Sequence, residues 1–201
     1  MKKLFIILAV IGLVSFNADP TISKKERKSA ASFLKDSEKN VMKALGNYSD
    51  EQLKYKAAPD KWSVQDCMMH IAASEKMIWT MVEQSLKGAA NPEKRADIKM
   101  TDEQVMTVVE SRENKVKTST ALEPQNTGFN SVEEAVTSFK SNRGKLIDFV
   151  KNTNIDLRNH VATLPFGSLD GYQMLLFIGA HSNRHAAQMR EVVADPGFPK
   201  K

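Results

Sequence analysis

Near its carboxyl end the chain reads Leu169-Asp-Gly-Tyr-Gln-Met-Leu-Leu-Phe-Ile-Gly-Ala-His181-Ser-Asn-Arg-His185-Ala-Ala-Gln-Met189. Its apolar residues continue at helical spacing to Val193, and no other predicted helix is as apolar. We expect a buried helix over residues 169–193, with Ser168 as its N-cap. Asp170 falls in the first turn, where a carboxylate suits the positive end of the helix dipole. This segment therefore predicts the centre of a helical fold.

Two histidines in this helix, His181 and His185, lie one turn apart and project from the same face. This is the spacing of a two-histidine metal clamp, although two solvated histidines would show it too. Of the other two histidines, His70 lies beside the apolar face of an earlier predicted helix, and His160 precedes a Pro/Gly turn. Three protein ligands with an open position are typical of catalytic zinc sites, so our hypothesis places His70, His181 and His185 on one divalent metal.

The rest of the chain shows further amphipathic helices with recognisable start signals. Capping-box patterns at Ser23-Lys-Lys-Glu26 and Ser63-Val-Gln-Asp66 precede apolar residues at helical spacing. The predicted helices span residues 23–46, 64–87, 101–116, 131–150 and 169–193, with a short turn after Ser49. The 101–116 helix is charged and weakly apolar, so we expect it on the outside. Because no strand-like alternation or repeat is visible, the predicted class is all-α, a four-helix bundle with one extra peripheral helix.

The amino terminus resembles a targeting segment. The chain has 201 residues, enough for one domain with a substantial core. Met1-Lys-Lys precedes the apolar run Leu4–Val14, which is short for a membrane span. We expect residues 1–18 to be a signal peptide and residues 19–201 to form the bundle domain, exported to the periplasm or secreted. A retained membrane anchor is the alternative.

Charge and cysteine content narrow the classes of partner. Removal of residues 1–18 leaves 27 basic and 24 acidic residues, a net charge of +3. Basic and acidic residues are interspersed along every predicted helix, so we expect no nucleic-acid partner. Cys67 is the only cysteine, and no intrachain disulfide can form. Cys67 lies about one turn before His70. A small buried apolar residue is its commoner role, and a fourth metal ligand or a reactive thiol is the alternative.

Two paired motifs resemble the signature regions of the DinB family. The first is Lys61-Trp-Ser-Val64 leading to His70-Ile-Ala-Ala-Ser-Glu75, and the second is Gly167-Ser-Leu-Asp-Gly-Tyr-Gln173 leading to His181-Ser-Asn-Arg-His185-Ala-Ala-Gln188. Segments 111–115 and 138–143 also stand where that family has similar ones. The resemblance covers nearly everything after the predicted signal peptide.

This resemblance implies an up-up-down-down bundle and a divalent metal held by His70, His181 and His185. The metal would be Zn, Ni, Fe or Mn, since imidazole accepts most first-row divalent ions. Family members include transferases and isomerases that act on small molecules with a low-molecular-weight thiol such as bacillithiol or mycothiol. Dimers are common among them, so a homodimer is implied. Export would remove the chain from the compartment rich in such thiols, which weakens the transferase reading.

Several residues near the predicted ligands have expected roles. Gln188, one turn beyond His185, would orient its imidazole. Arg184 would meet either an anionic substrate or a surface salt-bridge partner, and His160 is either structural or on the substrate side. Glu75 is either a proton acceptor or a surface residue; because it points well round the helix from His70, we expect it on the surface.

The leading hypothesis is an exported metal-dependent enzyme that hydrolyses a small molecule or transfers a thiol, with no catalytic residue assigned beyond the ligands. The alternative is a non-catalytic helical bundle that binds metal or a partner. A third reading is a purely structural pocket.

Overall fold

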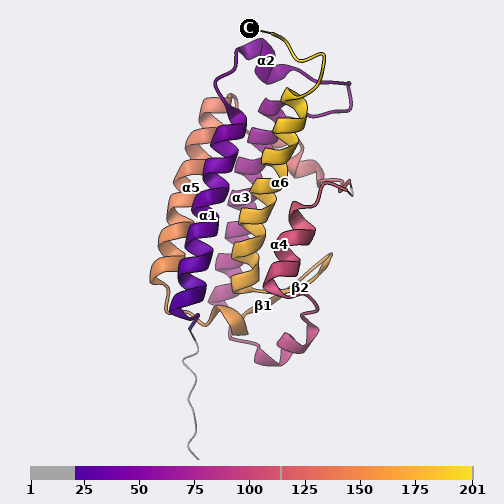
Figure 1. Ribbon diagram of the computed structural model, residues 1–201. Coiled ribbons are helices and arrows are strands. Elements are labelled where there is room, and N and C mark those ends of the chain that lie inside the picture. Colours follow the sequence, from indigo (N-terminus) through magenta and orange to yellow (C-terminus); the bar gives the residue numbers. More distant parts are fainter. Residues whose placement is uncertain (1–20, 114, 201) are drawn as a thin grey trace, which may run out of the picture.

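The computed structural model describes residues 21–113 and 115–200 (Figure 1). The predicted signal peptide therefore lies outside the described residues. The bundle consists of α1 (Lys24–Leu45), α3 (Val64–Lys87), α5 (Val132–Asn152) and α6 (Gly171–Val193). Around the bundle the order is α1, α6, α3, α5, so that α1 lies diagonally across from α3. The expected all-α four-helix bundle is confirmed.

The directions of the four helices follow an uncommon pattern. Helices α1 and α6 run the same way, and α3 and α5 run the opposite way (Figure 1). Two neighbouring helices thus point up and the next two point down around the perimeter. Along the chain, however, the order is up, down, down, up rather than the expected up-up-down-down. The reason is that the connection from α3 to α5 travels back along the bundle before α5 begins.

Part of that connection is α4 (Asp102–Glu110), the expected extra helix. It is shorter than the predicted 101–116 segment and packs against α6 rather than standing apart from the core. Val105 is fully buried, whereas Val116 lies beyond the helix and is 78% exposed. The prediction of a charged outer face was correct, and buried Val105 together with half-buried Met106 and Val109 packs the helix against the first apolar cluster of the bundle.

A β-hairpin that the sequence analysis did not expect precedes α6. Strand β1 (Val161–Leu164) pairs antiparallel with β2 (Gly167–Asp170), and Val161 lies opposite Asp170. The two residues between the strands reverse the chain, and Gly167 has a φ of +133°, which favours glycine. Four-residue strands are too short to show an alternating pattern, so the prediction of no strand was wrong.

The hairpin also changes the start of α6. Ser168 lies in β2, and the N-cap is Asp170 instead. Its carboxylate accepts a hydrogen bond from the Gln173 backbone N–H, while the Gln173 side chain accepts from the Asp170 N–H. Aspartate satisfies the free N–H groups of a first turn as well as serine does, and its charge suits the helix dipole.

The remaining elements are short: α2 (Asp50–Lys54) and the 3₁₀ turns η1 (Pro92–Asp97), η2 (Thr120–Leu122), η3 (Pro124–Asn126) and η4 (Leu157–Asn159). The predicted capping boxes at Ser23 and Ser63 are both formed. Gly46 ends α1 with a φ of +60°, as its position after the last apolar residue indicated. No helix among the residues described here has the length and apolar character needed to cross a membrane.

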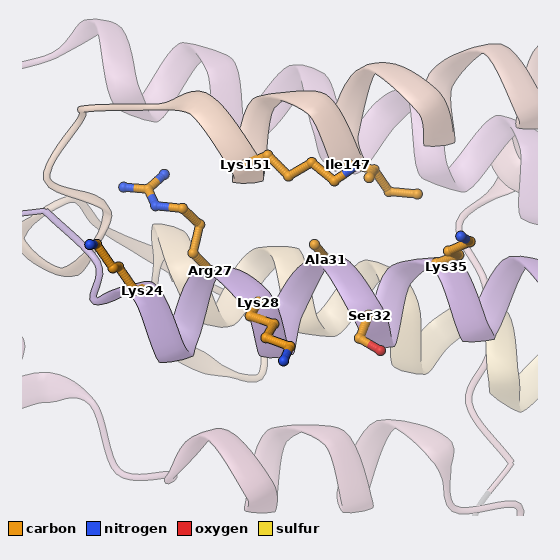
Figure 2. Close-up of a pocket in the computed structure, with 8 residues that line it drawn as sticks. All are labelled: Lys24, Arg27, Lys28, Ala31, Ser32, Lys35, Ile147 and Lys151. Atoms are coloured by element: carbon orange, nitrogen blue, oxygen red, sulfur yellow. The ribbon is translucent and has the colours of Figure 1, made fainter.

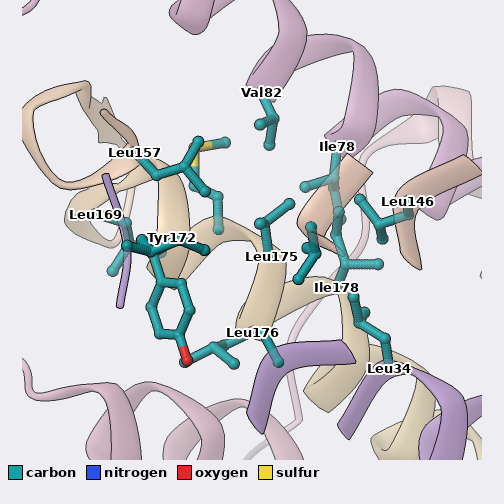
Figure 3. Packing of buried hydrophobic residues seen from close by; sticks show 14 of the residues in the cluster. Leu34, Ile78, Val82, Leu146, Leu157, Leu169, Tyr172, Leu175, Leu176 and Ile178 are labelled. Atoms are coloured by element: carbon teal, nitrogen blue, oxygen red, sulfur yellow. The ribbon is translucent and has the colours of Figure 1, made fainter. Parts of the chain in front are cut away.

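The bundle interior consists of two apolar clusters. The first cluster, toward the hairpin, includes Leu34, Ile78, Leu146, Leu175 and Ile178 (Figure 3). The second cluster, toward α2, includes Val41, Ile71, Phe139, Ala186 and Met189. Between them along the four helices lie the buried polar residues Ser37, Glu75, Arg143 and Ser182, which we call the polar layer. Burial of each large apolar side chain contributes about 1.5–3 kcal/mol.

Candidate metal centre

Three histidines from two helices meet at one point inside the bundle. His70 comes from α3, and His181 and His185 come from α6. One ring nitrogen of each lies within 4.8 Å of the others. The Nε2 atom of His181 is 3.3 Å from that of His70 and 3.2 Å from that of His185. The structure thus brings together the three side chains that the sequence placed in one site.

Hydrogen bonds fix the orientation of two of these rings. The Nδ1 atom of His70 is 2.8 Å from the Leu122 carbonyl oxygen, and that of His185 is 2.9 Å from the Gln188 side-chain oxygen. Because both oxygens only accept, each Nδ1 carries the proton and donates it. The Nε2 atoms of His70 and His185 therefore present lone pairs toward His181.

This arrangement fits a metal ion. A proton on Nε2 of His181 could be shared well with only one of the two facing lone pairs, and the only other donor near them is the Ser74 hydroxyl, whose oxygen is 3.3 Å from the His70 Nε2 atom, among the contacts of the described residues. A cation can accept all three. For tetrahedral coordination with bonds of about 2.0–2.1 Å, the nitrogens lie about 3.3 Å apart. The observed separations of 3.2 and 3.3 Å match that spacing.

The electrostatic environment keeps the three rings neutral. Burial lowers the pKa of His70. Burial lowers the pKa of His181 to about 3, and the nearby His70 ring and Arg184 cation further disfavour a positive charge there. The pKa of His185 is also far below its usual value, because of burial first and of the neighbouring histidines second. Neutral imidazole is the form that binds a metal.

Aromatic rings surround the histidines. The Trp62 ring stacks on His185 with 5.8 Å between ring centroids and lies 4.8 Å from His70. On the other side Phe177 stacks parallel to His181 at 6.0 Å, and Phe166 of the hairpin turn stacks on Phe177 at 5.3 Å. Sequence reasoning assigned none of these rings to the site. The spacing of Phe177, four residues before His181, was the available signal.

Gln188 lies where it was expected, bonded to His185, and it has a further partner. Arg112, in the segment after α4, donates a 3.4 Å hydrogen bond to the same Gln188 oxygen. Arg112 also donates to both carboxylate oxygens of Glu191, at 3.1 and 2.7 Å. Its guanidinium thus ties the segment after α4 to α6 beside the histidines, a contact that no local sequence pattern could indicate.

Arg184 and His160 occupy different surroundings. Arg184 is 9% exposed, so the expected surface position is wrong, and burial followed by the nearby Arg112 charge lowers its pKa. His160 lies beside the hairpin, away from the cluster. Its ring nitrogens are 2.7 Å from the Asp156 carbonyl oxygen and 3.2 Å from that of Gly88. These contacts correspond to the structural reading of His160.

Cys67 and Glu75 are both buried. Cys67 belongs to the second cluster, and burial raises the pKa of its thiol, so it behaves as the apolar residue that was the commoner expectation. Glu75 was expected on the surface but is 2% exposed. Its carboxylate forms an ion pair with Arg143, with N–O distances of 3.0 and 2.6 Å. The prediction considered only the His70 face of α3, whereas α5 covers the face that carries Glu75.

Arg143 joins all four helices of the bundle through the polar layer. Besides Glu75 of α3 it donates to the Ser182 hydroxyl of α6 at 2.8 Å. It also donates to the Leu34 carbonyl and the Ser37 hydroxyl of α1, at 2.7 and 2.6 Å. Because Ser182 follows His181, this network lies directly beside the histidine cluster.

Comparisons with known proteins agree with this fold. The DinB superfamily profile matches residues 34–189. The uncharacterized protein YuaE of Bacillus subtilis (strain 168) is 28% identical over 154 residues, which cover 76% of this chain and 88% of YuaE. The solved structure of YfiT from Bacillus subtilis, described as a probable metal-dependent hydrolase with an unusual four-helix bundle topology, superposes with a TM-score of 0.60. That match covers 89% of this chain and 92% of YfiT at 16% identity, a level that supports the fold alone.

The profile match covers most of the chain, and it agrees with the two sequence motifs and with the helical bundle. The protein therefore belongs to the DinB superfamily.

Proposed function

We propose that this protein is a metal-dependent enzyme acting on a small molecule, with His70, His181 and His185 as the ligands of one divalent ion. The observation that carries the proposal is the convergence of three Nε2 atoms, two of them held with lone pairs facing the third. Hydrolysis is the leading reaction, because YfiT, with the same fold, is described as a probable metal-dependent hydrolase.

The residues around the site have separable tasks in this proposal. The Leu122 carbonyl and the Gln188 side chain hold two of the imidazoles in the orientation that binding needs. Trp62 and Phe177 cover the ring faces and limit the access of water. When bound, a divalent ion supplies Lewis-acid activation of a nucleophile, either water or a thiol.

The test is an assay of ester, amide and electrophile-plus-thiol substrates with added Zn, Ni, Mn or Fe. We expect metal-dependent turnover of at least one ester or amide, and a fall in kcat/KM of about 10³-fold or more in His185→Ala. The matched control His160→Asn removes an imidazole outside the cluster and should retain activity. Turnover that occurs only with added thiol would identify a thiol transferase instead of a hydrolase. Tight metal binding without turnover of any substrate would favour the alternative of a non-catalytic metal-binding bundle.

Export and self-association remain part of the proposal. The charged start and the apolar run Leu4–Val14 support a signal peptide. We expect the protein recovered from the producing cell to begin at Asp19, which amino-terminal sequencing would show; a chain that begins at Met1 would contradict cleavage. The homodimer implied by the family would appear in sedimentation as twice the chain mass.

A further inference from the structure

A groove rich in basic residues runs between α1 and α5 (Figure 2). It has a volume of about 520 Å³ and is lined by Lys24, Arg27, Lys28, Ala31, Ser32, Lys35, Ile147 and Lys151, which we call the basic groove. Ala31 and Ile147 give it a partly apolar floor, and lysines stand along its edges. The histidine cluster and the family motifs do not account for it.

Among the residues that the structure describes, the lysines of the basic groove have no close anionic partner; Lys35 acts on neighbouring Asp36 only electrostatically, and Asp36 pairs directly with Lys39. Lys24, Lys28, Lys35 and Lys151 are all exposed, and none forms an ion pair within the described part of the chain. The acidic side chains nearest in sequence on α1 are engaged elsewhere. Glu26 pairs with Arg158 at 2.6 Å, and Asp36 pairs with Lys39 at 3.0 Å. The groove therefore carries uncompensated positive charge.

Arg27, unlike the lysines of the basic groove, forms hydrogen bonds within the fold. Its guanidinium donates to the carbonyl oxygens of Val150 and Thr153, at 2.9 and 2.8 Å, at the end of α5. This contact ties α1 to α5 and fixes the width of the groove at that end. The remaining cations therefore stand on a rigid support rather than on a loop.

The length of the groove indicates the size of its ligand. Lys24 and Lys35 are eleven residues apart on one helix, a distance of about 16 Å along its axis. That is too long for one small anion. It suits a row of separate anionic groups lying over an apolar floor, which is how phospholipid headgroups are arranged at a membrane surface.

The position of the groove is consistent with such a surface. Helices α1 and α5 form one side of the bundle, and α3 and α6, which carry the histidines, form the opposite side. A membrane that lay against the basic groove would therefore leave the histidine side of the bundle facing away from it.

We propose that the basic groove docks the protein on anionic phospholipid headgroups. The four free lysines pair with lipid phosphates, and the floor of Ala31 and Ile147 lies against the glycerol and first acyl groups. Attraction of this kind is short in range, because salt screens it beyond about 10 Å.

The experiment compares lysine modification by an amine-reactive reagent on the full chain. The chain is mixed with vesicles of phosphatidylcholine alone or with phosphatidylglycerol added. We expect phosphatidylglycerol to slow the modification of Lys24, Lys28, Lys35 and Lys151, while exposed Lys43 and Lys54 at the other end of the bundle are unchanged. The double variant Lys28→Glu/Lys35→Glu should reduce the protection of Lys24 and Lys151 roughly fivefold or more. The control Lys43→Glu/Lys54→Glu changes the net charge by the same amount and should leave the protection of Lys24 and Lys151 unchanged.

Equal protection of the groove lysines and of Lys43 and Lys54 would overturn the proposal in favour of a general charge effect. Equal modification in both kinds of vesicle would overturn it as well. Protection by dissolved glycerol phosphate as strong as that by phosphatidylglycerol vesicles would show that the ligand is a free phosphate compound rather than a membrane.

Discussion

Two imidazoles of the candidate centre are oriented by neighbouring oxygen atoms, one of which, from Gln188, the sequence predicted and one of which, from Leu122, it did not. The Leu122 carbonyl orients His70, and the Gln188 amide orients His185. These contacts determine which ring nitrogen carries the proton and so which one is available to bind. The site is therefore defined as much by oxygen acceptors as by histidines.

Gln188→Ala should weaken metal binding by about 10–100-fold without unfolding the protein, because His185 loses the acceptor that fixes its ring. The measurement is a competition titration against a chromophoric chelator. Gln84→Ala, which removes an exposed glutamine from α3, is the matched control and should bind as the unaltered chain does. Equal affinity for the two variants would show that Gln188 does not orient the ligand.

Arg143→Met should destabilise the fold by about 3–5 kcal/mol, because it leaves the Glu75 carboxylate buried without its cation. The double variant Arg143→Met/Glu75→Leu removes both charges and should be more stable than Arg143→Met alone. Urea denaturation measures both free energies of unfolding. A double variant less stable than the single one would mean that the polar layer is held by more than charge pairing.

Helical periodicity predicted which residues share a face of one helix. It did not predict the contacts that those residues make with side chains from other segments. The one-turn separation of His181 and His185 follows from helical geometry, and His70 was proposed as the third ligand from its place beside an apolar helix face, a choice that the motif resemblance then supported. The burial of Glu75 depends on Arg143, which is 68 positions away in sequence. Arg112 likewise reaches Gln188 from a segment with no regular structure. Such contacts are set by tertiary packing and leave no local pattern.

At the scale of elements, one side chain joins the starts of three helices. Arg158 pairs with Glu26 in the first turn of α1, with Asp102 at the start of α4 and with Asp170 at the N-cap of α6. The guanidinium is also 4.2 Å from the centre of the Tyr172 ring. Each carboxylate interacts favourably with the positive end of its own helix dipole, and all three pair with the Arg158 guanidinium. The starts of the three helices are therefore fixed relative to one another.

Glu26→Gln should therefore have an effect that depends on pH. Burial raises the pKa of Glu26, but hydrogen bonds from Ser23 and Arg158 outweigh it and lower the pKa overall. A lowered folded-state pKa gives stability that is present above the unfolded value of about 4.3 and is lost as the pH falls through the folded value. We expect a loss of about 1 kcal/mol at pH 7 that disappears once the pH has fallen below the folded-state pKa of Glu26.

Urea denaturation across this pH range measures the free energy of unfolding, with Glu51→Gln, a change at an exposed residue of α2, as the control. The control should be nearly neutral throughout. A Glu26→Gln deficit that persists unchanged at low pH would show that the carboxylate charge is not what stabilises this end of the bundle.

Helix starts were the most predictable elements and the hairpin was the least. Ser23, Ser49, Ser63 and Thr101 each combine a short polar cap with Glu, Gln or Asp three residues later, a signal that is complete within four residues. The hairpin strands have four residues each, and their pairing competes with the apolar run of α6 that follows. Ser168 was therefore mistaken for the cap that Asp170 provides.

At the scale of the whole molecule, the apolar faces of the helices required a bundle but did not fix the direction of each helix. Periodicity is the same read from either end, so the up, down, down, up order along the chain depends on the connection through α4. The resulting square places α3 beside α6, which is what allows His70 to meet His181 and His185. The opposite side, between α1 and α5, carries the basic groove.

In the proposed function, His70, His181 and His185 hold one metal ion. This proposal is tested most directly by the metal content of the purified chain after exposure to excess Zn, Ni, Mn or Fe and removal of loosely bound ions, measured by inductively coupled plasma mass spectrometry. We expect about one ion per chain in the unaltered protein and in His160→Asn, and none above background in His70→Ala, His181→Ala or His185→Ala. A His181→Ala chain that retains as much metal as the unaltered protein, or an unaltered chain that retains none of the four metals, would contradict this proposal.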